Sequence, residues 1–146
     1  MYSKAGNRIA AARIADASAV IDHKLDWAAA SGEDEAKYLV AILNSQVVLD
    51  RVKPLQALGL FGTRDFDKTV FHVPIPTYDP SNPAHSALVT VADESEALAA
   101  SVDLASASDF KRARTLIRDA LAESGLATGI EAAVAAVVPE VGPLAG

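Results

Sequence analysis

Apolar and polar residues first recur with the period of a strand, near the start of the chain. Two apolar-rich segments, Arg8–Ile14 and Ala19–Ala29, flank a short polar turn at residues 15–18. From Val20 to Trp27, mostly polar residues at every second position alternate with mostly apolar ones. This imperfect alternation is compatible with a strand packed mainly on one face. The pattern predicts a β-hairpin. The many alanines leave helix as the alternative, because alanine favours helix and disfavours strand.

Helical spacing begins after this segment. Ser31 can cap a helix whose first turn carries three acidic residues, and apolar side chains then recur at helical spacing as far as Asn44. A second short helix is predicted over Val47–Leu58, with Pro54 as its start, kink or break. The β-branched and aromatic segment Thr69–Val73 then predicts a strand.

The rest of the chain shows only helical patterns. One helix is predicted over Ala84–Val102, and a second begins at Ser108 as N-cap and ends at Gly125. The apolar stripe of a third helix runs from Ile130 to Val138. We therefore expect one α+β domain over residues 1–146, with a mixed strand and helix half (1–76), a helical half (84–138) and a frayed tail (139–146).

Composition narrows the class of protein. The chain has 146 residues, of which 51% are hydrophobic and 22% charged, as in a soluble globular domain. No uncharged stretch is long enough to cross a membrane, and the first residues lack the apolar run of a signal peptide. The chain has no cysteine, which excludes disulfides, thiolate zinc sites and a cysteine nucleophile. We expect a cytoplasmic protein with no membrane partner.

Charge is distributed unevenly. Residues 1–74 hold nine Lys/Arg and nine Asp/Glu, whereas residues 75–146 hold four and ten, so the whole net charge of −6 comes from the second half. Nucleic-acid-binding proteins usually carry a basic excess on one face. Any DNA contact is therefore expected in the first half. A local basic stripe in the second half, Lys111, Arg114 and Arg118, predicts either a solvated helix face or a contact with phosphate or an acidic partner.

Common catalytic motifs are missing. The glycines never occur as G-x-G, and neither G-K-S/T nor G-x-S-x-G is present. The three histidines lack the H-x₃-H spacing of zinc sites. Asp22 and Lys24 have the acid-x-lysine spacing of metal-dependent nucleases, but Glu35 and Lys37 repeat it on a predicted helix. A metal-dependent hydrolase is thus a distant alternative.

Three segments in order carry a family resemblance. They are the helix of residues 35–45, which reads EAKYLVAILNS, the segment 62–68, which reads GTRDFDK, and residues 72–79, which read HVPIPTYD. This order resembles the C-terminal, target-recognition-like region of large adenine-specific DNA methyltransferases of bacterial restriction-modification and phage-defence systems. The opening segment 5–13, His85 and residues 110–118 also resemble that region, so the likeness spans nearly the whole chain.

The resemblance implies a chain that is inactive alone. In those enzymes an upstream domain binds S-adenosylmethionine and transfers the methyl group, through a glycine-rich loop and an Asn/Asp-Pro-Pro-Tyr/Phe motif. This chain has neither, since Asp79-Pro80 is followed by Ser81. No catalytic, cofactor or metal residue is therefore assigned. The implied partners are the catalytic domain and, through the full-length enzyme, double-stranded DNA in the bacterial cytoplasm.

Two sets of residues follow from the matching segments. The first set is predicted to serve the fold, by hydrogen bonding at a helix end and by ending the predicted strand: Asn44, Ser45, Pro74 and Pro76. The second set carries the side chains that read bases or neutralise phosphates, and forms the candidate DNA contacts: Arg64, Lys68, Gln56, Lys4, Arg8 and Arg13. Arg64 and Lys68 have local pairing with Asp65 and Asp67 as their alternative role.

The resulting functional hypothesis is a non-catalytic C-terminal domain that assists target DNA recognition or positioning. The alternative is a structural or protein-interaction module without DNA contact, whose acidic helical half and Ile130–Val138 stripe dock on the rest of the enzyme or form a homo-oligomer. The two hypotheses differ in a testable way. DNA recognition needs the cations to converge on one surface, whereas docking needs an exposed apolar patch on the C-terminal helices.

Overall fold

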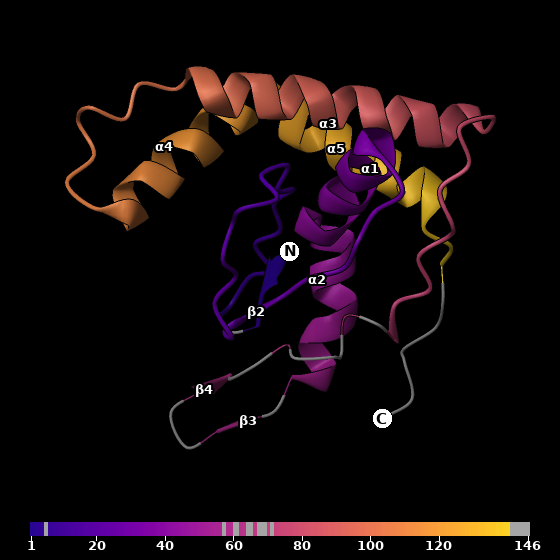
Figure 1. Ribbon diagram of the computed structural model, residues 1–146, viewed down its shortest axis with the longest axis horizontal. Helices are drawn as coiled ribbons and strands as arrows, with labels where there is room; N and C mark the ends of the chain where they lie inside the picture. Colours follow the sequence, from indigo (N-terminus) through magenta and orange to yellow (C-terminus); the bar gives the residue numbers. More distant parts are fainter. Residues whose placement is uncertain are drawn as a thin grey trace.

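The computed structural model of the chain is a mostly helical α+β fold (Figure 1). It describes residues 1–4, 6–56, 58–59, 62–63, 66, 70 and 72–140, with the backbone alone at 58–59 and 62–63. The helices are α1 (Glu33–Asn44), α2 (Gln46–Val52), the 3₁₀ turn η1 (Lys53–Leu55), α3 (Pro83–Ser101), α4 (Phe110–Glu123) and α5 (Leu126–Val137).

Helix α3 is the longest element and organises the others. It lies across one end of α1, and α5 runs along its far side, while α4 returns beneath its C-terminal half (Figure 1). A Cβ at Gly129 of α5 would come within 3.3 Å of a Val91 methyl carbon on α3, so the small residue permits the close approach of the two helices. The core is built from completely buried apolar side chains on four helices: Tyr38, Ile42, Val48, Val52, Leu88 and Val134.

The strands are very short. β1 (Tyr2–Ser3) pairs antiparallel with β2 (Leu25–Asp26), with Tyr2 opposite Asp26, and β3 (Leu58–Gly59) pairs antiparallel with β4 (Gly62–Thr63). The predicted hairpin of Arg8–Ile14 with Ala19–Ala29 is therefore wrong. Between these segments, Asp16 and Asp22 accept backbone N–H groups two residues ahead, which favours turns over extended chain.

The strand predicted over Thr69–Val73 is also wrong. Val70 and His72 lie in 3₁₀ turns, and the N–H of Val73 donates to the carbonyl of Val70 at 3.2 Å. Thr69 and Phe71 lie outside the described residues. Val70 and Val73 are buried, so the apolar character that suggested a strand serves the core directly. Pro74 and Pro76 follow outside any helix or strand and have no N–H to give to a ladder.

The helix bounds agree closely with the sequence, but two predicted caps do not. Gly32, not Ser31, precedes α1, and the carboxylate of Glu35 reaches back to the N–H of Ser31. Asp109, not Ser108, caps α4 by accepting the N–H of Arg112 at 2.9 Å. In both cases the residue after the predicted one is the N-cap. Ser108 and Asp109 are both suited to cap α4, whereas Gly32 precedes α1 without a side-chain cap.

The end predicted for the second helix is wrong, because α2 and η1 together end at Leu55 and Leu58 lies in β3, whereas three other boundary signals are confirmed. Ser45 separates α1 from α2, where its hydroxyl donates to the carbonyl of Ile42 and accepts the N–H of Val48. Pro54 coincides with the change from α2 to the 3₁₀ turn η1. Gly125 has φ +80° and ends α4, a left-handed conformation that glycine adopts without strain. Of the predicted tail, residues 141–146 lie outside the described part.

Candidate functional site

The predicted DNA-contact residues fall into three groups. Arg64 and Lys68 lie outside the described residues. Lys4 pairs with Asp26, with 3.2 Å between Nζ and Oδ1, and Gln56 is only 5% exposed and donates its amide to the carbonyl of Gly6 at 3.0 Å. The interactions of Lys4 and Gln56 thus hold the N-terminal segment in place. Arg8 is exposed and forms no hydrogen bond or ion pair with any described residue.

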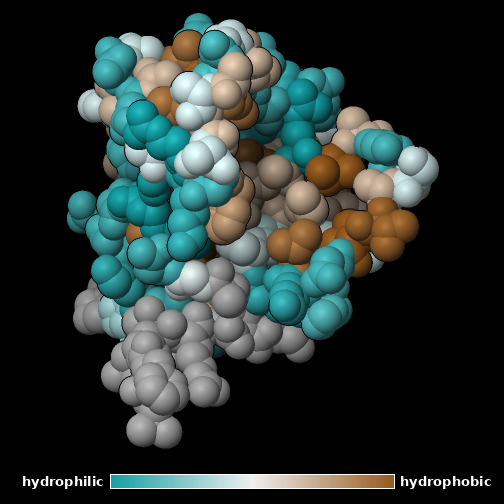
Figure 2. Space-filling model, turned by 90° about the vertical axis from the view of Figure 1, so that its left-hand side faces the viewer, coloured by the Kyte–Doolittle hydropathy of each residue, from teal (hydrophilic) through white to brown (hydrophobic). Residues whose placement is uncertain are grey.

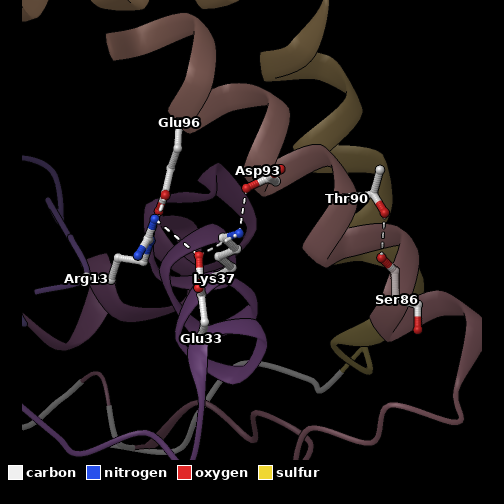
Figure 3. A network of polar contacts seen from close by, with 7 residues as sticks. All are labelled: Arg13, Glu33, Lys37, Ser86, Thr90, Asp93 and Glu96. Carbon is white, nitrogen blue, oxygen red and sulfur yellow. Dashed lines mark hydrogen bonds and ion pairs between the residues drawn. The ribbon is translucent and has the colours of Figure 1, made fainter. Parts of the chain in front are cut away.

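Arg13 belongs to a charged network between the N-terminal segment, α1 and α3 (Figure 3). Its guanidinium lies 2.7 Å from Glu96 of α3 and 3.5 Å from Glu33 of α1. Lys37, which is buried, reaches Glu33 at 3.0 Å and Asp93 at 2.5 Å. Since every cation here faces two carboxylates, the network links three segments and leaves no free positive charge.

The pKa values of the network follow from these contacts. The hydrogen bond from Lys37 and its positive charge hold the pKa of Asp93 below its ordinary value, and the same two effects lower the pKa of Glu33, with a smaller contribution from the charge of Arg13. Hydrogen bonds to the two carboxylates raise the pKa of Lys37. Glu33, Lys37 and Asp93 are therefore all charged at neutral pH.

Of the residues predicted to serve the fold, Asn44 and Ser45 lie at a helix end as expected, whereas the strand that Pro74 and Pro76 were predicted to end is not formed. The side-chain amide of Asn44 forms two hydrogen bonds with the backbone of Ala11, at 3.0 Å and 2.9 Å, and a third with the carbonyl of Val40. The hydroxyl of Tyr38 donates to the carbonyl of Pro76 at 3.0 Å. Burial raises the pKa of Tyr38 to about 12, so this donor keeps its proton.

The ring of Tyr38 also lies in an aromatic cluster. Its centroid is 4.9 Å from that of His85 and 5.4 Å from that of Tyr78. Nδ1 of His85 accepts the N–H of Asp79 at 3.0 Å, so the imidazole joins the start of α3 to the segment that precedes it. His85 is thus part of the core and not a ligand on the surface.

A groove with a volume of about 870 Å³ lies between the N-terminal segment, α1 and the three C-terminal helices. We call it the α4 groove. Its lining is mainly apolar, with eight alanines and larger aliphatic side chains from four segments: Ile9, Val40, Ile117, Leu121 and Ile130. Figure 2 shows the face that carries α4 and the N-terminal segment, where the surface is hollowed and apolar side chains gather in and beside the hollow.

Arginines border this groove from two sides. Arg8 comes from the N-terminal segment, and Arg114 and Arg118 come from α4. None of the three forms an ion pair with a described residue, although Arg118 donates to the hydroxyl of Thr115 at 3.3 Å. The structure therefore brings two predicted DNA-contact residues, Arg8 and the ion-paired Arg13, together with part of the basic stripe of α4.

The two acids of the groove are already engaged. Glu96 holds Arg13, and the carboxylate of Glu131 accepts the N–H groups of Gln46 and Val47, at 2.7 Å and 3.3 Å. Glu131 thus caps α2 from a different helix and complements its positive end. No pattern in the sequence predicts this cap, because Gln46 and Glu131 are 85 residues apart in the chain.

The other candidate sites have less support. The apolar stripe of α5 mostly faces its own core, where Val134 and Val138 are buried, and only its first residue, Ile130, lines the α4 groove. Asp22 lies before a turn and not on a strand, and the described residues contain no group of three or more His, Asp or Glu arranged to hold a metal ion. A second cavity of about 750 Å³ beside Trp27 is lined mostly by alanine and aliphatic side chains. Nothing on its border selects a class of ligand.

Two further findings concern the chain as a whole. Among the helices of the described part, no single one combines the length and apolar character of a membrane span, although α4 and α5, bent by 75°, would meet these criteria as a pair. Comparison with protein-family models, with curated proteins and with solved structures finds no match for this chain.

Proposed function

We propose that the chain is a non-catalytic C-terminal domain of a bacterial DNA methyltransferase or restriction-modification enzyme. In this role it acts in the cytoplasm and helps to position target DNA. A separate domain of the enzyme binds S-adenosylmethionine and methylates an adenine that has been turned out of the duplex.

One observation carries the proposal: segments on which the resemblance rests contact one another. Tyr38, from residues 35–45, bonds to Pro76, from residues 72–79, and Asn44 bonds to Ala11 in the opening segment. Residues that hold distant segments together are constrained in type and order by the fold. These hydrogen bonds give the matched segments a structural role that does not require any of these residues to touch DNA.

DNA contacts in this proposal come from cations without an acidic partner. Among the predicted contacts that the structure describes, Arg8 meets this condition. Arg64 and Lys68 join it as predicted contacts. Such side chains neutralise phosphates and fix the register of a protein on the duplex.

The test is a fluorescence-anisotropy titration of the chain with mixed-sequence duplex DNA at low and near-physiological salt. We expect binding that weakens with salt and is lost when Arg64→Ala and Lys68→Ala are combined. Arg8→Ala should lower the slope of log affinity against log salt by about 1. Lys53→Ala, which removes an exposed cation of η1, is the matched control and should change the slope less.

A protein-interaction module without DNA contact is the second candidate. The α4 groove favours it, because the groove is mainly apolar and DNA offers few apolar surfaces to fill it. The absence of DNA binding even at low salt would support this candidate and contradict the first.

A further inference from the structure

We infer that the α4 groove binds an amphipathic helix of a protein partner, with apolar side chains in the groove and carboxylates against Arg114 and Arg118. The inference stands on the groove and does not depend on the proposed DNA role. Its three supports are the lining, the charges at the border and the backbone of the surrounding elements.

The lining calls for an apolar occupant. Ile117 and Leu121 lie one turn apart on α4 and line the groove together with Ile9 and Ile130. A groove of about 870 Å³ has room for several aliphatic or aromatic side chains in a row. Burying them removes apolar surface from water on both partners, which is the main favourable term in association.

The border selects the charge of the occupant. Arg114 and Arg118 are one turn apart, exposed and without acidic partners in the described chain, whereas both acids of the groove are taken by Arg13 and by the start of α2. The charged residues that line the groove are thus four arginines and two glutamates, an excess of positive charge. An incoming segment with Asp or Glu beside its apolar side chains matches this excess, and one with Lys or Arg meets repulsion.

The backbone around the groove selects a helix. Four of the five lining segments are helices, which satisfy their own N–H and C=O groups, and Ala11 of the fifth is bonded on both sides by Asn44. An extended peptide would find few backbone partners there and would bury unpaired polar groups. A helix satisfies its own backbone and presents apolar side chains at i, i+4 and i+7.

The test is selection from a displayed library of helical peptides, with the whole chain as bait and its Leu121→Arg variant for counter-selection. We expect enriched peptides that combine aliphatic or aromatic residues at helical spacing with Asp or Glu beside them. The enriched peptide is then titrated by anisotropy. Arg114→Glu with Arg118→Glu should weaken its binding at least about tenfold, and exchanging its acids for lysines should restore binding to that variant.

Arg112→Glu is the matched control for each single substitution, because it makes the same charge change as Arg114→Glu or Arg118→Glu alone, at a residue of α4 outside the groove. Its effect should stay within about twofold, and circular dichroism should give the same helix content for all variants. Three results would overturn the inference: no peptide separates the chain from Leu121→Arg, the enriched peptides lack acids, or Arg112→Glu weakens binding as much. Duplex DNA that competes through Arg114 and Arg118 would assign the groove to DNA instead.

Discussion

Cations are paired with carboxylates at the α1–α3 interface, whereas they are unpaired with any described residue on the exposed side of α4. At the interface, Lys37 and Arg13 each contact two carboxylates, and the interface buries Tyr38 and Leu88 completely. On α4, none of the four cations pairs with a described acid, and no described residue of the helix is fully buried. Paired charges over a buried core belong to the part that holds the fold, whereas unpaired arginines beside an apolar groove belong to the part that is free to bind.

The sharpest way to break this comparison is to remove one aromatic ring from each region. Tyr38→Ala leaves a cavity in the core and frees the carbonyl of Pro76, so it should lower the free energy of unfolding by about 3–5 kcal/mol. Urea unfolding followed by circular dichroism measures it. Tyr38→Phe keeps the ring and should cost only about 1 kcal/mol. A loss under about 1 kcal/mol for Tyr38→Ala would contradict the assignment of this region to the core.

The attachment of the N-terminal segment to α1 gives the next effect. Asn44→Ala removes three hydrogen bonds, two of them to Ala11, and should lower the free energy of unfolding by about 1 kcal/mol. Hydrogen exchange should show faster exchange at Ala11 than in the unaltered chain. Asn44→Asp keeps an acceptor for the N–H of Ala11 and is expected to lie between the two. Unchanged exchange at Ala11 would show that other contacts hold this segment.

Lowering the pH should destabilise the α1–α3 interface but not the contacts of α4. The pKa values of Glu33 and Asp93 are lowered in the folded chain, so unfolding takes up protons as the pH falls. Their contribution to stability is complete above the ordinary values of 4.5 and 3.8 and is lost as the pH falls through the lowered values. It is smaller than the effect of Asn44→Ala, because both side chains are more than half exposed, at 60% and 62%.

Thermal unfolding at pH 7 and pH 3 measures this loss. Lys37→Met removes the main cause of both pKa shifts, so its melting temperature should fall less between the two pH values than that of the unaltered chain. An equal fall in both proteins would mean that the acid sensitivity comes from other carboxylates.

The smallest effect is expected on α4. Phe110 is 66% exposed, so Phe110→Ala should change the free energy of unfolding by no more than about 0.5 kcal/mol. The same urea experiment as for Tyr38→Ala applies, and the two substitutions remove a similar ring. A loss above about 2 kcal/mol would place α4 in the cooperative core and remove the contrast between the two regions.

Local patterns in the sequence determined much of this protein. Apolar spacing, Pro54 and Gly125 located the helices to within a few residues, because a helix depends on contacts between residues three and four apart. The broad α+β class follows from the same patterns. Asn44 and Ser45 were identified correctly as helix-end residues, since their short polar side chains reach the backbone nearby.

The tertiary structure decided the strands and the site. The two failed strand predictions rested on alternation and β-branched residues, but a strand needs a partner, and the partner of Leu25–Asp26 turned out to be Tyr2–Ser3 and not Arg8–Ile14. Nor could the sequence show which cations form ion pairs with acidic residues. Arg8 and Arg13 are alike as residues and both line the α4 groove, yet only Arg13 is held by Glu33 and Glu96, because folding brings Glu96 of α3 to within 2.7 Å of it.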